Sequence, residues 1–296
     1  MPDASSSLLS PTFLAQLERL ELVTRKIFHG RMKGERRSKR KGQSSEFADF
    51  RNYVVGDDLR FLDWNLYARL DRLFLRLFLE EEDLHLYLLL DASASMDFGS
   101  PSKFQFARQV AAALGFIGLA NLDRVVIHTV GSTLQSGLPP LRGRRSLWRL
   151  LDHLEKIEPG GPGDLMNSLR RFAIQAPGKG IVILLSDFLD REGYTSALRY
   201  LVARNMDLFA IHILSEEELD PDLTGDIQLL DVEDGEATEL TAHPALLRRY
   251  RENLQTFCQD LERFCLQRGI NYCFARTGQP FDRLVLDHLR SRGLVR

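Results

Sequence analysis

The sequence predicts an α/β protein built on a doubly wound, mostly parallel sheet with helices on both faces. Short runs of large apolar residues recur along the chain, and each has the length of a strand rather than of a helix. Strands that are buried on both faces give such continuous runs. Between the runs, apolar residues recur at helical spacing, and this alternation is typical of a parallel sheet. The central runs cover residues 84–90, 124–130, 180–185 and 206–214.

The remaining elements follow from capping residues, turn residues and periodicity. Helices are expected over 11–26, 101–120, 145–156, 165–175, 194–203, 244–268 and 280–292. Further strands are expected at 73–79, 133–138 and 271–275. An acidic stretch over 215–241 contains an apolar run at 227–232 and a turn at 233–235, which together indicate a hairpin.

Composition places the chain among globular proteins that work in water. It has 296 residues, of which 44% are hydrophobic and 27% charged, and its net charge is −2. No stretch approaches the ~18 consecutive apolar residues of a membrane span, and the first residues lack the pattern of a signal peptide. The three cysteines, Cys258, Cys265 and Cys273, form no CxxC pair, which indicates buried thiols in a reducing compartment. We therefore expect a cytoplasmic protein.

Candidate ligands for a metal ion follow two of the predicted central strands. Asp91, Ser93 and Ser95 come directly after the first strand, and Asp187 follows the strand at 180–185. In open α/β sheets, ligands bind at the carboxyl ends of strands. A cluster of oxygen atoms alone suits a hard cation such as Mg²⁺ rather than Zn²⁺. The alternative is an ordinary strand-to-turn junction in which the hydroxyls and the acid cap turns or helices.

A basic run over residues 25–42 contains nine Lys or Arg residues and one acid, Glu35. Such a run is typical either of a nucleic-acid or anion site or of a solvated loop. Aromatic residues do not interleave with the charges, as a platform for stacking single strands would require. The composition therefore favours the solvated loop, and nucleic-acid binding stays the alternative.

The following segment, residues 44–83, mixes opposite charges with aromatic residues. Because burial of unpaired charges is costly, this mixture predicts a compact segment held by ion pairs. We expect residues 1–80 to form an accessory segment, with a helix, the basic loop and β structure. We expect it to pack on an α/β domain over 81–296.

Residues within this segment and on both sides of it, taken in order, make the chain resemble the bacterial family called domain of unknown function 58. The matching residues are Gly34, Ser38, Gly42, Glu46-Phe47, Arg51, Tyr53, Gly56-Asp57-Asp58, Arg60, Asp63-Trp64, Ala68-Arg69, Arg76 and then Asp91 to Met96. The resemblance implies a von Willebrand factor A-like fold. It also implies a functional partnership with a MoxR-type AAA+ ATPase.

The same resemblance implies a metal-ion-dependent adhesion site, whose signature is DxSxS. In that site the two serines bind the metal directly, and these map onto Ser93 and Ser95. The aspartates map onto Asp91 and Asp187. The family's usual threonine is missing, because Gly163 stands in its place, and the adjacent Asp164 is the candidate substitute. Mg²⁺ or Mn²⁺ is the implied cofactor, and a degenerate site that no longer binds metal is the alternative.

A site of this type leaves one coordination position for an acidic side chain of a partner protein. We therefore expect a non-enzymatic adaptor that works in the assembly or maturation of other proteins. The sequence contains no Walker A, GxGxxG, GxSxG or HExxH motif. The pattern Ser100-Pro-Ser-Lys103 fits SxxK, but the other motifs of that enzyme class are missing, so we interpret it as chance. A metal-dependent hydrolase is the less favoured alternative.

Overall fold

The computed structural model describes residues 8–22, 47–78, 84–135, 137–178, 180–204, 206–232, 235, 237–291 and 293–295. The basic run over 25–42, the alternative nucleic-acid site, lies outside these ranges. The chain divides into two compact units. One comprises Met1–Met32 with Leu84–Arg296, and the other comprises Lys33–Asp83. The first helix is thus grouped with the larger unit.

The larger unit is a doubly wound α/β fold, as predicted. Its sheet has five parallel strands in the order β4-β3-β5-β6-β9. This order reverses direction between β3 and β5, which is where open α/β sheets bind ligands. The strands are β3 (His85–Asp91), β4 (Arg124–Val130), β5 (Gly180–Ser186), β6 (Asp207–Leu214) and β9 (Asn271–Arg276).

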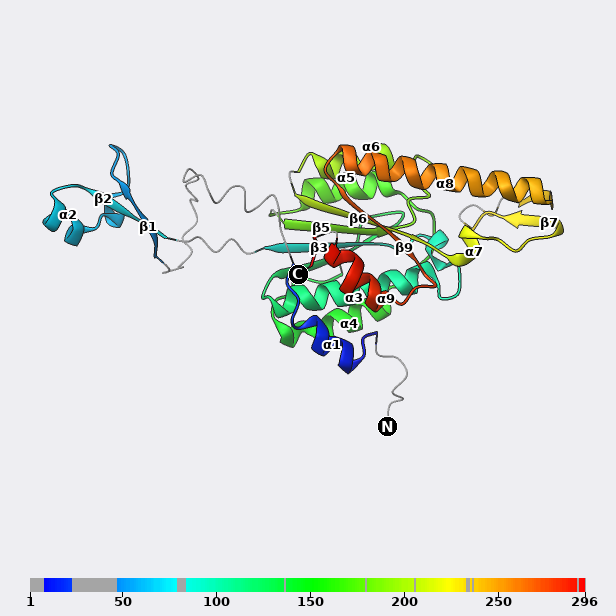
Figure 1. Cartoon of the computed structure of the whole chain (residues 1–296), viewed down its shortest axis with the longest axis horizontal. Helices are drawn as coiled ribbons and strands as arrows, with labels where there is room; N and C mark the ends of the chain where they lie inside the picture. The colour runs from blue at the N-terminus through cyan, green and yellow to red at the C-terminus, as the bar shows by residue number, and fades with distance from the viewer. Residues whose placement is uncertain are drawn as a thin grey trace. The chain divides into compact units, whose positions relative to one another are not determined.

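Helices cover both faces of this sheet, and the alternating side chains of β3 show how the two layers are divided. Leu86, Leu88 and Leu90 join one buried cluster, and Tyr87 and Leu89 join the other. Figure 1 shows α1, α3, α4 and α9 on the first face and α5, α6 and α8 on the second. A strand that contributes to two cores cannot carry polar residues on either side, and this explains the unbroken apolar run.

Most helices lie where the sequence predicts them. The first is shorter than expected, and the last is divided by a π-helical turn over Leu284–His288. The predicted strand at 133–138 is replaced by isolated antiparallel bridges from Gln135 and Leu141 to β4. The helices of the larger unit are α1 (Pro11–Leu17), α3 (Lys103–Ala120), α4 (Leu147–Lys156), α5 (Leu165–Gln175), α6 (Tyr194–Val202), α7 (Glu216–Leu219), α8 (Pro244–Gln267), α9 (Phe281–Arg283) and α10 (Leu289–Ser291). In the described ranges, no helix is both long enough and apolar enough to cross a bilayer.

The predicted hairpin is present between α7 and α8. Its strands are β7 (Gly225–Leu230) and β8 (Ala237–Ala242), which pair in antiparallel register. Most of its side chains are exposed on both faces. The hairpin is therefore an arm that contributes little to the core.

In its described residues, 47–78, the smaller unit is an antiparallel pair of strands with one α-helix and a short 3-10 helix (Leu59–Phe61). Its elements are β1 (Phe47–Asn52), α2 (Trp64–Leu70) and β2 (Phe74–Phe78). The ion pairs expected from the sequence are present. Arg51 Nη2 lies 3.0 Å from Asp57 Oδ1, and Arg76 Nε lies 2.8 Å from Asp63 Oδ2. Asp63 also accepts a hydrogen bond from the backbone N–H of Leu66 and is the N-cap of α2. Because it pairs with Arg76 of β2 as well, it joins the start of α2 to that strand.

The close contact between β3 and β5 gives a stability test at Gly180. A Cβ atom at this position would lie 2.0 Å from the carbonyl oxygen of His85 on β3. We expect Gly180→Ala to lower the free energy of unfolding by about 2–3 kcal/mol, because two backbones must separate. Gly160→Ala is the control, since no atom lies within 4 Å of its added methyl group. Chemical denaturation of both variants measures the difference, and equal losses would contradict the close strand contact.

Candidate metal-binding site

The carboxyl ends of β3 and β5 meet at the point where the strand order reverses, and a small hollow lies there. It is lined by all the predicted ligands together with residues of three loops. Its volume of about 10 Å³ is the room for one water molecule or one metal ion. The polar residues that line it are Asp91, Ser93, Ser95, Asp164, Ser186, Asp187 and Asp190.

Asp91 is held in place by hydrogen bonds to both of its carboxylate oxygens. Oδ1 accepts from the backbone N–H of Ser93 at 3.0 Å and from its hydroxyl at 2.8 Å. Oδ2 accepts from the Ser186 hydroxyl at 2.5 Å. The hydroxyl oxygens of Ser93 and Ser95 lie 3.0 Å apart. Three hydroxyls and one carboxylate are therefore gathered by the loop after β3 and the end of β5.

The Asp91 carboxyl lies in an unfavourable place for a negative charge. Burial, together with the charge of Asp187, raises its pKa to about 6. The hydrogen bonds from Ser186 and Ser93 act in the opposite direction and lower the pKa. Because like charges and low dielectric both oppose ionisation, a cation in the hollow would stabilise this carboxylate.

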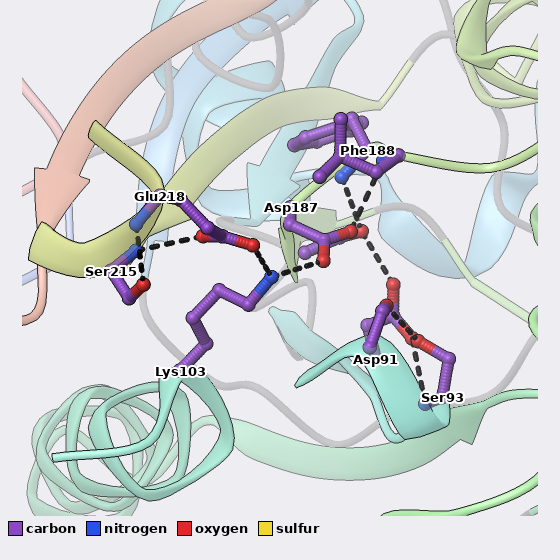
Figure 2. A network of polar contacts seen from close by, with 10 residues as sticks. Asp91, Ser93, Lys103, Asp187, Phe188, Ser215 and Glu218 are labelled. Atoms are coloured by element: carbon purple, nitrogen blue, oxygen red, sulfur yellow. Dashed lines mark hydrogen bonds and ion pairs between the residues drawn. The ribbon is translucent and has the colours of Figure 1, made fainter. Parts of the chain in front are cut away.

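Asp187 takes part in a second network, in which Asp187 and Lys103 are buried and Glu218 is partly exposed (Figure 2). The ammonium group of Lys103, whose side chain is 0% exposed, donates to Asp187 Oδ2 at 2.7 Å and to Glu218 Oε1 at 2.5 Å. Asp187 Oδ1 accepts from the Leu189 amide at 3.0 Å. The residue between them, Phe188, has a φ of 58°, in the left-handed region. The sharp turn after β5 thus directs Asp187 toward both the hollow and Lys103.

Asp164 lies at the wall of the hollow but already has a structural role. It is the N-cap of α5, and its two carboxylate oxygens accept from the backbone N–H and the side-chain amide of Asn167 at 2.9 and 2.8 Å. Gly163 beside it offers no side-chain oxygen. The loop is fixed from the other side by Asp190, which accepts from the Leu165 amide at 2.8 Å. Asp164 would therefore have to leave its cap to bind a metal directly.

The residues present fit a hard divalent cation. The lining acids Asp91, Asp164, Asp187 and Asp190, together with Glu218 and against Lys103, leave a formal excess of four negative charges around the hollow when the acids are ionised. Ser93 and Ser95 supply neutral oxygen ligands, and water completes such sites readily with Mg²⁺. In the described part of the chain, no three carboxylate, imidazole or thiol side chains stand close enough to hold a metal without other ligands. A metal here would depend on the hydroxyls.

The sequence indicated the groups that directly follow strands, but it did not indicate Lys103 and Glu218, which come from helices, or Ser186, which ends β5. Lys103 and Ser186 were not assigned to the site, and Glu218 was seen only as part of an acidic stretch. A signal for Glu218 was available, because Ser215 and Glu218 have the spacing of a capping box, and both of its hydrogen bonds are present. Nothing local in the sequence pairs Glu218 with Lys103.

The fold and this hollow define an α/β protein with a candidate cation site at its topological switch point. The chain belongs to the family described as "Protein of unknown function DUF58", whose model matches residues 49–257. Two similar relatives are uncharacterized protein Mb1516 of Mycobacterium bovis and uncharacterized protein Rv1480 of Mycobacterium tuberculosis. Each is 28% identical over 241 residues, which are 80% of this chain and 76% of the relative.

Solved structures resemble the chain more distantly. BatB from Bacteroides thetaiotaomicron is 12% identical with a TM-score of 0.45, and the match covers 71% of this chain and 98% of BatB. A von Willebrand factor type A protein from Catenulispora acidiphila is 13% identical with a TM-score of 0.42, covering 72% of this chain and 42% of that protein. Likeness at this level says nothing about the hollow, whose chemistry rests on its own residues.

The raised pKa of Asp91 predicts how stability depends on pH when metal is removed. The proton on this carboxyl stabilises the fold below pH 3.8, and that contribution is lost as the pH rises through about 6. An amide stays neutral throughout. In EDTA we expect Asp91→Asn to be more stable than the wild type by about 2–3 kcal/mol near neutral pH and little different at about pH 4.

Urea unfolding at both pH values measures this difference. A gap between the two proteins that does not change with pH would contradict it. Asp260→Asn, which removes an exposed carboxylate on α8, is the control and should show no such gap.

Proposed function

We propose that this protein is a non-enzymatic, metal-assisted interaction module that presents Mg²⁺ or Mn²⁺ to an acidic side chain of a partner protein. The observation that carries the proposal is the convergence of Asp91, Ser93, Ser95 and Asp187 on one ion-sized hollow at the switch point of the sheet. Ser93, Ser95 and Asp91 would hold the metal, with Asp187 behind them. The ion would supply a positive charge to which a partner's carboxylate can bind.

The site's own groups favour binding over catalysis. Catalysis needs a base or a nucleophile with a free position toward a substrate. Here both oxygens of Asp91 accept hydrogen bonds, and the Ser93 hydroxyl donates to Asp91. Lys103 is enclosed between two carboxylates, so its amine is neither exposed nor deprotonated. These contacts hold the groups in place around an ion, which is the role that the proposal gives them.

The position of the hollow also suits a protein partner. Its rim is made by the loops after β3 and β5 and by the loop between α4 and α5, and Ser95 and Asp164 at the rim are partly exposed. A second, larger hollow of about 440 Å³ shares Gly163, Asp164 and Asp190 with it and extends to Arg191. A segment of a partner could therefore lie beside the metal while one acidic side chain reaches it.

The resemblance to the family suggests which partner to test. We propose a MoxR-type AAA+ ATPase as the functional partner, in the assembly or maturation of other proteins. An ATPase of this type would supply the energy of nucleotide hydrolysis, and this chain would supply the contact.

Calorimetric titration of Mg²⁺ and Mn²⁺ into the purified protein tests the metal site. We expect Asp91→Ala to weaken binding by at least about tenfold, because a buried carboxylate is lost from the site. Asp260→Ala should bind as the wild type does. Equal binding by the wild type and Asp91→Ala would overturn the metal site, and no binding to the free wild type would restrict it to a site that a partner's carboxylate completes.

Capture of a purified MoxR-type ATPase from the same organism tests the partnership. We expect capture in Mg²⁺ and its loss in EDTA or with Asp91→Ala, since the metal would bridge two carboxylates. Capture that persists in EDTA and with Asp91→Ala would show that the two proteins meet at another surface. An ATPase that is not captured in any condition would overturn the partnership.

A further inference from the structure

Lys103 is a buried cation at a position that disfavours it on local grounds. It is the first residue of α3, where the helix dipole is positive and a lysine is destabilising. Its side chain is 0% exposed, so its ammonium group has lost water entirely. The carboxylates of Asp187 and Glu218, at 2.7 and 2.5 Å, are the groups that compensate for this cost.

Glu218, the second carboxylate that binds Lys103, is itself held by hydrogen bonds. Glu218 Oε2 accepts from the Ser215 amide at 2.9 Å, and the Glu218 amide donates to the Ser215 hydroxyl at 3.1 Å. The Tyr250 hydroxyl on α8 donates to the Glu218 carbonyl at 2.9 Å. Lys103 is therefore held in a rigid pocket between α7 and β5 (Figure 2), and it has no alternative position when a second cation arrives.

The loop before Lys103 is hydrogen-bonded to α7, the helix that carries Glu218. The Ser100 amide donates to Glu217 Oε1 at 3.1 Å. Gly99 has a φ of 94°, and a Cβ atom there would lie 2.5 Å from the Ser215 side chain. The loop that leads from the serines of the site to Lys103 thus lies against the start of α7.

We propose that Lys103 is a resident cation that shares Asp187 with the metal ion and sets the affinity of the site. This inference rests on the metal site of the proposed function. One oxygen of Asp187 is occupied by the ammonium group, and like charges repel strongly in a site shielded from water. Lys103 therefore weakens the binding of a divalent ion to the free protein. Gly163, which offers no ligand, acts in the same direction, so a partner's carboxylate is needed to complete the site.

Two variants test this role. Calorimetric titration measures their affinity for Mn²⁺, and thermal unfolding in EDTA measures the stability of their metal-free forms. Lys103→Met should bind Mn²⁺ more tightly than the wild type while its metal-free form is less stable, because two buried carboxylates lose their partner. The double variant Lys103→Met with Glu218→Gln removes both charges and protects the fold. It should bind about tenfold more tightly than the wild type, because the cation removed lies nearer to Asp187 than the anion does.

Lys156→Met is the matched control, since Lys156 is exposed and its charge is screened by water. It should change the affinity by less than about twofold. A purely structural role for Lys103 predicts that stability and metal affinity fall together, whereas the proposal predicts that they move in opposite directions. Affinities of the double variant at or below that of the wild type would overturn the proposal.

The outcome separates this inference from the proposed function. Equal binding by the wild type and the double variant would reject the role of Lys103 and leave the metal site intact. Binding by the double variant alone would support the role of Lys103 and reject a metal-loaded site in the free wild-type protein. Binding by neither protein would overturn both.

Discussion

The repulsion between two carboxylates at the ends of neighbouring parallel strands is the constraint on which the site depends. Asp91 and Asp187 both lie buried at the switch point of the sheet, where water screens their charges poorly. The protein compensates for this in two ways. Ser93 and Ser186 donate hydrogen bonds to Asp91, and Lys103 donates to Asp187. The compensation is incomplete, because burial and the charge of Asp187 still raise the pKa of Asp91 above its usual value.

The same constraint explains why distant elements are joined so firmly around the hollow. Lys103 from the start of α3 and Glu218 from α7 meet beside Asp187 from the end of β5. Arg251 on α8 pairs with Asp220 just after α7, at 2.6 Å, so that the long helix is connected to the network as well.

The smaller unit presents a different physical problem. Among its described side chains, the buried ones are Leu62, Asp63 and Leu75, whereas Val55 and Trp64 are 93% and 61% exposed. A unit with so small a core needs further contacts for stability, and exposed apolar side chains of this kind are typical of surfaces that meet another surface. The packing of this segment on the α/β domain stays a prediction.

The sequence by itself determined the five strands of the main sheet, most helices and the oxygen-bearing residues that line the hollow. These features depend on local patterns: an unbroken apolar run predicts a strand buried on both faces, and Asp91 and Asp187 mark the ends of two such runs. The tertiary structure alone decided that Lys103 lies between Asp187 and Glu218, which are 84 and 115 residues away along the chain. Charge pairing at such separations leaves no periodic trace in a single sequence, because it depends on which strand ends and helix ends the fold brings together. The shortened first helix and the missing strand at 133–138 have the same origin, since packing overrides local propensity where the local signal is weak.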